Sequence, residues 1–373
     1  MRWLLSLVTV LFALACQPAE PPPPSVAAKA WFLLDINSGQ VLTAGHATER
    51  FEPASLTKLM TAYLVFGALK EKRLSLEQTV PVSERALKIG GARMFIQPRL
   101  PVTVKELLQG MIVQSGNDAC IALAESVAGS EENFAELMNR EARRLALKGT
   151  HFSNATGLSD PRHYSTAEDL GMLAAALIRD FPEYYGYYSQ KEYRYNNVTQ
   201  PNRNRLLWLD PNVDGMKTGH TDAAGYCLIA SARRDKRRML SVVLGASGES
   251  ARAQESQKLL NHGFLFFDDV MLYEKDQPVS RLPVWKGSER VLKAGARADL
   301  YASVPKGMSD RLKAELISQQ PLIAPVALGQ RVGTIRVSLD GKPLAEYPVV
   351  ALEAIGPAGV FGRMFDTVRL WFN

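Results

Sequence analysis

Apolar residues recur at helical spacing through much of the first two thirds of the chain. Pro53 suits the first turn of a helix, and apolar side chains follow it at intervals of about 3.6 residues. Residues 104–129 repeat this pattern, but the polar tip Ser115-Gly116-Asn117 interrupts it, which predicts two helices joined by a turn. Residues 165–168 form a capping box ahead of a further helix that runs through Ile178.

Apolar and β-branched runs predict strands on both sides of these helices. Residues 30–35 and 40–43 are expected to form two strands joined by a turn. Residues 226–231 and 239–244 predict a second pair, and the charged residues 233–238 between them indicate a solvated hairpin tip. Strands that enclose helices in this order predict a mixed α/β (α+β) domain.

The pattern changes beyond Asp269. Short β-type runs, separated by glycine and proline, continue to about Glu353. Among them, Asp340-Gly341 is a strong hairpin signal. These features predict a small β-rich second domain.

The last segment is amphipathic, with arginine opposite a row of apolar residues. Two interpretations stay open at this point: a terminal helix docked on the core, or a membrane anchor that lies in the lipid interface. The apolar positions that share one helix face are Phe361, Met364, Phe365, Val368, Trp371 and Phe372.

The N-terminus predicts an export signal. Arg2 precedes an apolar run that is too short to span a membrane, and residues 13–15 form an A-x-A cleavage site. Cys16 follows, and Pro21–Pro24 form a stiff tether. This order also resembles a bacterial lipoprotein signal, so simple cleavage and lipidation of Cys16 are both open.

Composition fits an ordinary folded protein of 373 residues, 46% hydrophobic and 22% charged. The net charge of +6 suits either an acidic surface or plain solubility. No basic cluster contains interleaved aromatic residues, which argues against a nucleic-acid partner. No His/Cys cluster has metal-ligand spacing, so no metal or other cofactor is expected. Cys120 and Cys227 are expected to be buried free thiols, with a disulfide between them as the alternative.

The pair Ser55 and Lys58 has the spacing of a nucleophile and its base. A serine hydroxyl needs a base beside it, and residues three apart on a helix project from one face. A lysine acts as a base only when neutral, which requires burial or nearby positive charge. By itself S-x-x-K carries little weight, because it occurs about once by chance in a chain of this length.

Two further polar motifs add candidate groups for proton transfer and substrate binding. At the helical tip, Ser115 is a candidate to relay a proton and Asn117 to bind a substrate amide, although such a turn also simply caps helices. Later, Lys217 and Thr218 offer a charge and a donor for a substrate carboxylate, and Gly219 would allow a substrate backbone to approach closely. Order and context make the joint match far rarer than each motif alone.

Together, the motifs S-x-x-K, S-G-N and K-T-G resemble those of the serine β-lactamases and penicillin-binding proteins. The middle motif is Ser115-Gly116-Asn117 rather than S-D-N, and residues 53–58 and 217–225 are similar to those of the penicillin-binding protein 5/6 type. That family comprises D-alanyl-D-alanine carboxypeptidases. The resemblance implies an export signal, a β-lactamase-like catalytic domain, a β-rich second domain and a C-terminal membrane helix.

Catalytic roles follow from this resemblance. Ser55 would be the acylated nucleophile and Lys58 its proton acceptor, while Ser115 and Lys217 would complete the proton network. The backbone N–H groups of Ser55 and His220 would form the oxyanion hole. From the residues alone, His220 is equally well a general acid or base, or a structural histidine.

Substrate binding is implied in the same way. Arg252 resembles the arginine that holds the terminal carboxylate, with help from Thr218, although Ser250-Ala251 replaces an expected glycine before it. The implied substrate is a peptidoglycan stem peptide that ends in D-Ala-D-Ala, and β-lactams would acylate the same serine. A DD-endopeptidase, a β-lactamase and a non-catalytic wall-binding scaffold are the alternatives.

The expected organisation has five parts. Residues 1–15 form the signal, 16–28 the tether, 29–270 the catalytic domain, 271–355 the β-rich domain and 356–373 the membrane helix. These parts predict an exported enzyme at the periplasmic face of the bacterial inner membrane.

Overall fold

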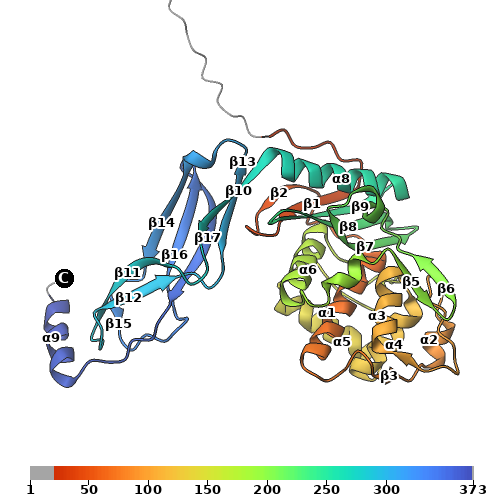
Figure 1. Ribbon diagram of the computed structural model, residues 1–373, viewed down its shortest axis with the longest axis horizontal. Helices are drawn as coiled ribbons and strands as arrows, with labels where there is room; N and C mark the ends of the chain where they lie inside the picture. The colour runs from red at the N-terminus through yellow and green to blue at the C-terminus, as the bar shows by residue number, and fades with distance from the viewer. Residues whose placement is uncertain (1–20, 372–373) are drawn as a thin grey trace, which may run out of the picture.

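The computed structural model describes residues 21–371. The predicted export signal, Cys16 and Phe372 lie outside these residues. The chain folds into a mixed α/β first domain and a β-rich second domain, followed by a separate terminal helix (Figure 1). This mixed α/β architecture with a second β-rich domain confirms the predicted fold class.

An antiparallel sheet of five strands, in the order β2-β1-β9-β8-β7, supports the first domain. Phe32 and Leu34 on β1 point into the core on one face, and Leu33 points into the core on the other. Helix α8 and the short helix α7 (Leu206–Leu209) pack on this second face, and the other helices of the domain cover the first (Figure 1). The elements are β1 Ala30–Asp35, β2 Val41–Gly45, β7 Val213–Thr221, β8 Gly225–Arg234, β9 Arg237–Ala246 and α8 Glu249–Phe266.

Between β2 and β7 the chain forms the helical layer. Helix α1 lies at its centre, where Leu59, Met60 and Phe66 are fully buried. Thr166 caps α6 by accepting from Asp169 N at 3.0 Å, one residue beyond the predicted cap at Ser165. The helices are α1 Lys58–Lys70, α2 Glu84–Lys88, α3 Val104–Val113, α4 Asn117–Ala128, α5 Glu131–Arg144, α6 Ala167–Asp180 and α7 Leu206–Leu209. Shorter elements are η1 Ala54–Thr57, η2 Tyr185–Ser189, β3 Thr79–Val80, β4 Val102–Thr103, β5 Glu192–Tyr195 and β6 Val198–Pro201.

The β-rich domain has its own core. Ile335, Val337 and Val349 are fully buried in a six-stranded sheet of order β14-β16-β17-β12-β11-β15. Asp340 and Gly341 both have positive φ, of 49° and 79°, so the predicted hairpin turn between β16 and β17 is confirmed. Its elements are β10 Phe267–Tyr273, β11 Pro278–Trp285, β12 Val291–Gly295, β13 Leu300–Pro305, η3 Ser309–Arg311, β14 Leu312–Ser318, β15 Leu322–Ile323, β16 Arg331–Leu339 and β17 Lys342–Ala351.

The charged run at residues 233–238 is only partly a solvated tip. Arg237 pairs with the fully buried Asp35 at 2.8 Å, and Arg238 forms an ion pair with Asp214 at 2.7 Å. Asp235 and Lys236 at the tip are exposed, as predicted, but the side chains of Arg237 and Arg238 are largely buried, so the prediction of a solvated tip was wrong for these two arginines. The reason is tertiary: their partners come from distant parts of the chain.

Helix α9 (Val360–Leu370) projects from the β-rich domain at the opposite end from the first domain (Figure 1). Lys286 N donates to Asp366 Oδ2 at 2.6 Å and tethers its polar side. Its apolar side chains remain exposed, with Phe361 at 85% and Trp371 at 83%. Docking of this helix on the core, one of the two interpretations, was therefore wrong. No helix in the described part of the chain is long and apolar enough to cross a membrane.

Candidate active site

Ser55 lies in the short turn η1, directly before α1. Pro53 precedes this turn, and Ala54 has a positive φ of 48°, a conformation that is uncommon for a residue with a Cβ. Buried Leu56 anchors the turn to the core, while Ser55 stays half-buried and lines a pocket. The local geometry therefore turns the hydroxyl of Ser55 toward solvent from a fixed base.

Lys58 is the first residue of α1 and is almost fully buried. Its Nζ lies 2.8 Å from Ser55 Oγ, 2.8 Å from Asn117 Oδ1 and 2.6 Å from the carbonyl oxygen of Thr156. Burial is the main cause that lowers the pKa of Lys58 below its usual value. A lysine in this setting is a suitable proton acceptor for the adjacent serine hydroxyl.

The tip between α3 and α4 supplies the second group of residues. Ser115 has a positive φ of 68°, and its buried Oγ has no hydrogen-bond partner among residues 21–371. Asn117 begins α4, and its Nδ2 donates to the carbonyl oxygen of Gly90 at 2.7 Å. The amide of Asn117 thus connects Lys58 to the loop that forms one wall of the pocket.

Strand β7 supplies the third group. Lys217 and Thr218 are buried, and Lys217 Nζ donates to the carbonyl oxygen of Thr218 at 3.0 Å. Burial, followed by the charge of Lys58, holds the pKa of Lys217 well below its usual value. The two lysines disfavour each other's charged forms, which favours at least one neutral amine in the site.

Gly219 packs against the turn that carries Ser55. A Cβ at this position would lie 3.2 Å from Ala54 Cβ and 3.2 Å from the carbonyl oxygen of Pro53. The glycine therefore allows β7 to pack closely against the turn that carries Ser55. Gly219 also lines the pocket, and the expectation that it lets a substrate backbone approach closely stays a prediction.

His220 and Arg252 lie at the other side of the site. The exposed imidazole of His220 packs against Tyr226, with ring centroids 4.1 Å apart and the rings tilted by 38°. Arg252 on α8 is buried, and it donates to the carbonyl oxygen of Gly219 at 3.3 Å and to Glu249 Oε1 at 3.3 Å. Burial lowers the pKa of Arg252, while the neighbouring Glu249 opposes this effect.

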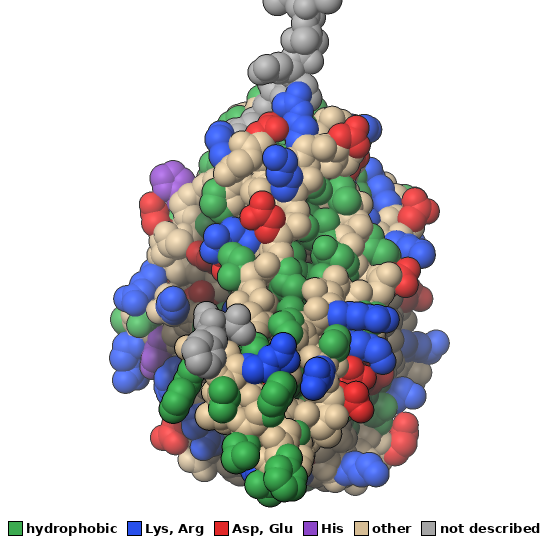
Figure 2. Space-filling model, turned by 90° about the vertical axis from the view of Figure 1, so that its left-hand side faces the viewer, with side chains coloured by type: hydrophobic (Ala, Val, Ile, Leu, Met, Phe, Trp, Pro, Cys, Tyr) green, Lys and Arg blue, Asp and Glu red, His purple; other side chains and the backbone are tan. Residues whose placement is uncertain are grey.

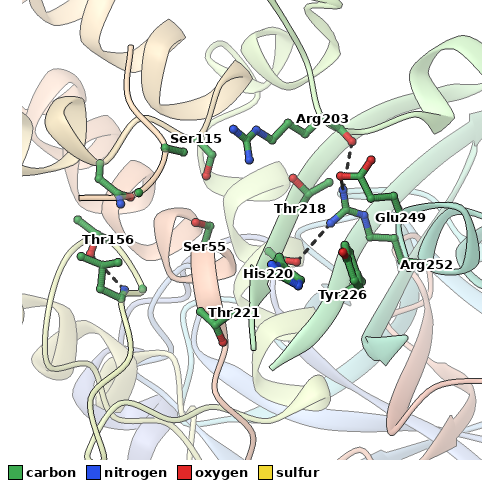
Figure 3. Close-up of a pocket in the computed structure, with 16 residues that line it drawn as sticks. Ser55, Ser115, Thr156, Arg203, Thr218, His220, Thr221, Tyr226, Glu249 and Arg252 are labelled. Carbon is green, nitrogen blue, oxygen red and sulfur yellow. Dashed lines mark hydrogen bonds and ion pairs between the residues drawn. The ribbon is translucent and has the colours of Figure 1, made fainter. Parts of the chain in front are cut away.

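A single pocket of about 240 Å³ joins these groups (Figure 3). Lys58 and Lys217 lie beneath its surface and do not line it. The predicted site residues that line it are Ser55, Ser115, Asn117, Thr218, Gly219, His220 and Arg252.

Sequence reasoning missed several residues of this pocket. Thr156 holds Lys58 through its backbone, so its side-chain identity gave no signal. Gly157 has a positive φ of 83°, and a Cβ there would lie 1.8 Å from the carbonyl oxygen of Ala54. Arg203 and Glu249 are charged residues in loop or helix-end positions, where no periodic pattern marks them.

A buried histidine supports the Ser55 turn from behind. His163 Nε2 and Thr57 Oγ1 are 2.7 Å apart, and Ser153 N donates to His163 Nδ1 at 3.1 Å. Since Nδ1 accepts this bond, Nε2 carries the proton and donates to Thr57. Burial lowers the pKa of His163 from 6.5 to about 4, although Asp160 opposes the effect. The imidazole is therefore neutral.

Comparison with known proteins agrees with this arrangement. The profile described as D-alanyl-D-alanine carboxypeptidase matches residues 17–248. The chain belongs to this carboxypeptidase family. The profile of the penicillin-binding protein 5 C-terminal domain matches residues 267–356 of the same carboxypeptidase.

Individual relatives match this carboxypeptidase over about two thirds or nearly all of its length. The D-alanyl-D-alanine carboxypeptidase DacC of Escherichia coli is 45% identical over 358 residues, which are 94% of this chain and 90% of that protein. Penicillin binding protein 5 from Haemophilus influenzae has a TM-score of 0.84 and 41% identity, covering 90% of this chain and 99% of that one. Penicillin-binding protein D2 of Listeria monocytogenes, solved in an ampicillin-bound form, has a TM-score of 0.60 and 31% identity, over 65% of this chain and 100% of its own. The protein is thus a serine-type D-alanyl-D-alanine carboxypeptidase.

Proposed function

We propose that Ser55 is the nucleophile of this carboxypeptidase and Lys58 its general base. The observation that carries the assignment is the 2.8 Å separation between Lys58 Nζ and Ser55 Oγ, in a site where burial lowers the pKa of the lysine. The neutral amine accepts the hydroxyl proton as Ser55 Oγ attacks the carbonyl carbon between the two terminal D-alanines. The backbone N–H groups of Ser55 and His220 stabilise the negative oxygen that forms.

Collapse of the tetrahedral intermediate breaks the C–N bond and leaves an acyl group on Ser55. Ser115 passes a proton to the departing D-Ala amine, a role that suits a buried hydroxyl with no partner in residues 21–371. Lys217 completes this proton network, and water then hydrolyses the ester. The side-chain amide of Asn117 accepts a hydrogen bond from Lys58 and would also bind the substrate amide.

Arg252 and Thr218 are proposed to bind the carboxylate of the terminal D-Ala. Both line the pocket that contains Ser55, and guanidinium groups are the strongest carboxylate ligands among side chains. Lys217 adds positive charge beneath Thr218 when it is protonated, and Gly219 keeps β7 against the Ser55 turn. The implied substrate is the peptidoglycan stem peptide.

Substitution of the nucleophile tests these roles. Ser55→Ala should abolish D-Ala release from a stem-peptide mimic and covalent labelling by a fluorescent penicillin, while the folded state persists. Ser189→Ala, at an exposed serine outside the pocket, is the matched control and should retain both activities. Covalent labelling of the Ser55→Ala protein would contradict the assignment.

The same assays separate the alternatives. The ampicillin-bound relative supports covalent β-lactam binding by this chain. Slow release of the penicilloyl group would agree with a carboxypeptidase, and rapid turnover would favour a β-lactamase. Defined dimeric muropeptides measure endopeptidase activity, and binding to cell wall without D-Ala release would favour a scaffold.

We further propose that α9 attaches the enzyme to the membrane surface. Hydrophobic side chains gather at the end of the molecule that carries this helix, with basic side chains beside them (Figure 2). An amphipathic helix of this kind lies in the lipid interface and does not span it. The exposed apolar residues are Val360, Phe361, Met364, Phe365, Val368 and Trp371.

This attachment fits the division expected from the sequence. Residues 1–15 would direct export, 16–28 would form the tether, and 29–270 and 271–355 would be the two domains. With 356–373 on the outer surface of the inner membrane, the enzyme would face the periplasm. The double variant Phe361→Ser/Phe365→Ser should lose flotation with anionic vesicles and keep D-Ala release. Ile323→Ser, at an exposed apolar residue of β15, is the control, and unchanged flotation of the double variant would contradict the proposal.

A further inference from the structure

The arginine proposed to bind the terminal carboxylate is already paired with a carboxylate of its own chain. Arg252 Nη2 donates to Glu249 Oε1 at 3.3 Å, and both residues line the pocket. Glu249 is the first residue of α8 and lies one helical turn before Arg252. Figure 3 shows the Glu249 carboxylate beside the Arg252 guanidinium. The Glu249 side chain is 58% exposed, so its charge reaches the space that a ligand would enter.

Arg252 makes two further contacts, with backbone carbonyl oxygens. Nη1 donates to the carbonyl oxygen of Gly219 at 3.3 Å, and Nη2 also contacts the carbonyl oxygen of Arg203 at 3.5 Å. An arginine binds a carboxylate most strongly through two parallel N–H groups. Because Glu249 takes one of these positions and offsets the charge of Arg252, a substrate carboxylate must compete with it.

Arg203 provides a contrast within the same pocket. Its side chain is exposed and makes no hydrogen bond or ion pair with any residue in the range 21–371. Figure 3 shows it extending between Ser115 and Thr218. The pocket therefore holds two guanidinium groups. Among the residues that the structure describes, only that of Arg252 is paired with a carboxylate, that of Glu249.

We propose that Glu249 is a specificity-determining residue that weakens the preference for a free C-terminal carboxylate and admits peptides whose terminal carboxylate is amidated. A free carboxylate is repelled by Glu249 and gains less from Arg252. A terminal amide carries no charge, and its NH₂ group can donate to the Glu249 carboxylate. The proposal rests on the proposed role of Arg252 as the carboxylate ligand.

The test compares two substrates that differ only at the C-terminus: a stem-peptide mimic ending in D-Ala-D-Ala, and the same peptide as its amide. Removing one negative charge beside the ligand should raise the acid-to-amide ratio of kcat/KM about three- to tenfold in Glu249→Gln. This rise in the ratio should come from a lower KM for the peptide with the free carboxylate, with kcat unchanged. The wild-type enzyme should release D-alaninamide from the amide at a measurable rate. Glu168→Gln, which removes an exposed first-turn acid of α6 outside the pocket, is the matched control.

Two further variants make the outcomes distinct. Glu249→Ala should raise the ratio as Glu249→Gln does, because both remove the charge. If Glu249→Gln leaves the ratio unchanged, or if Glu249→Ala lowers it, Glu249 only positions Arg252 and the proposal is overturned. Arg252→Gln should lower the ratio at least about tenfold. An unchanged ratio in Arg252→Gln would instead refute the assignment of Arg252 as the carboxylate ligand.

Discussion

The stability of the catalytic domain should depend on His163 in a defined range of pH. The imidazole is 2% exposed, and its two nitrogens bond to Thr57 Oγ1 and Ser153 N. Burial lowers the pKa of His163 from 6.5 to about 4. The unfolded chain therefore binds a proton at this residue at a higher pH than the folded chain does.

The two pKa values of His163 give the sign and the size of the pH effect on stability. Because the folded pKa is the lower one, the stabilising effect is complete above about pH 6.5 and is lost progressively as the pH falls to about 4. One proton changes the free energy of unfolding by about 1.4 kcal/mol per pH unit, so this interval amounts to about 3 kcal/mol. That is a large part of the roughly 5–15 kcal/mol by which folded domains are stable.

Urea unfolding of the full chain, followed by circular dichroism between pH 4 and 7.5, measures this effect. His163→Gln should be less stable than the wild type at pH 7, since it disturbs two buried hydrogen bonds. The difference should shrink by about 3 kcal/mol as the pH falls to 4, because only the wild type loses the contribution of His163. His46→Gln, at an exposed histidine, is the control. A stability difference that stays constant over the whole range would refute the reasoning.

Two other variants probe the site itself. Gly157→Ala should destabilise the enzyme by at least about 3 kcal/mol and strongly reduce penicillin labelling, since its Cβ would lie 1.8 Å from the carbonyl oxygen of Ala54. Thermal unfolding measures this loss, and Gly186→Ala, with no atom within 4 Å of the new Cβ, should be nearly neutral. Because burial lowers the pKa of Lys58, kcat/KM should rise with pH and level off below the usual lysine range near 10.5. Lys58→Arg keeps its proton and should slow acylation at least about 10³-fold at every pH; a rate close to wild type would exclude Lys58 as the base.

Local signals in the sequence were sufficient to predict much of the fold. The strands around residues 30–35 and 226–231, and the helices around Ser115-Gly116-Asn117, follow from periodicity and turn chemistry within short windows. The hairpin at Asp340-Gly341 was predictable because its two positive φ values suit these two residues. In each case the physical cause lies within about ten residues of the feature.

Contacts between distant segments were not predictable in this way. Residues 233–238 form a dense charged run, yet Arg237 is largely buried because it pairs with Asp35 on the neighbouring strand β1. The pairing of Arg252 with Glu249 is local, at i and i+3 on α8, but its place in the pocket depends on distant segments that form the other walls. A sequence pattern reports the residue types but not which side chains the fold brings into one site.

The backbone conformation of the candidate site could not be predicted from the sequence either. Ala54 and Ser115 flank the reacting groups with positive φ, a backbone conformation that residues with a Cβ adopt at a cost of order 1–3 kcal/mol each. Glycine would relieve this cost, but at position 115 it would remove a hydroxyl that lines the pocket. At position 54 strand β7 packs closely against the strained turn, because Gly219 has no Cβ. Burial of α1 and α4 stabilises both conformations, so the chemistry depends on packing that no local motif contains.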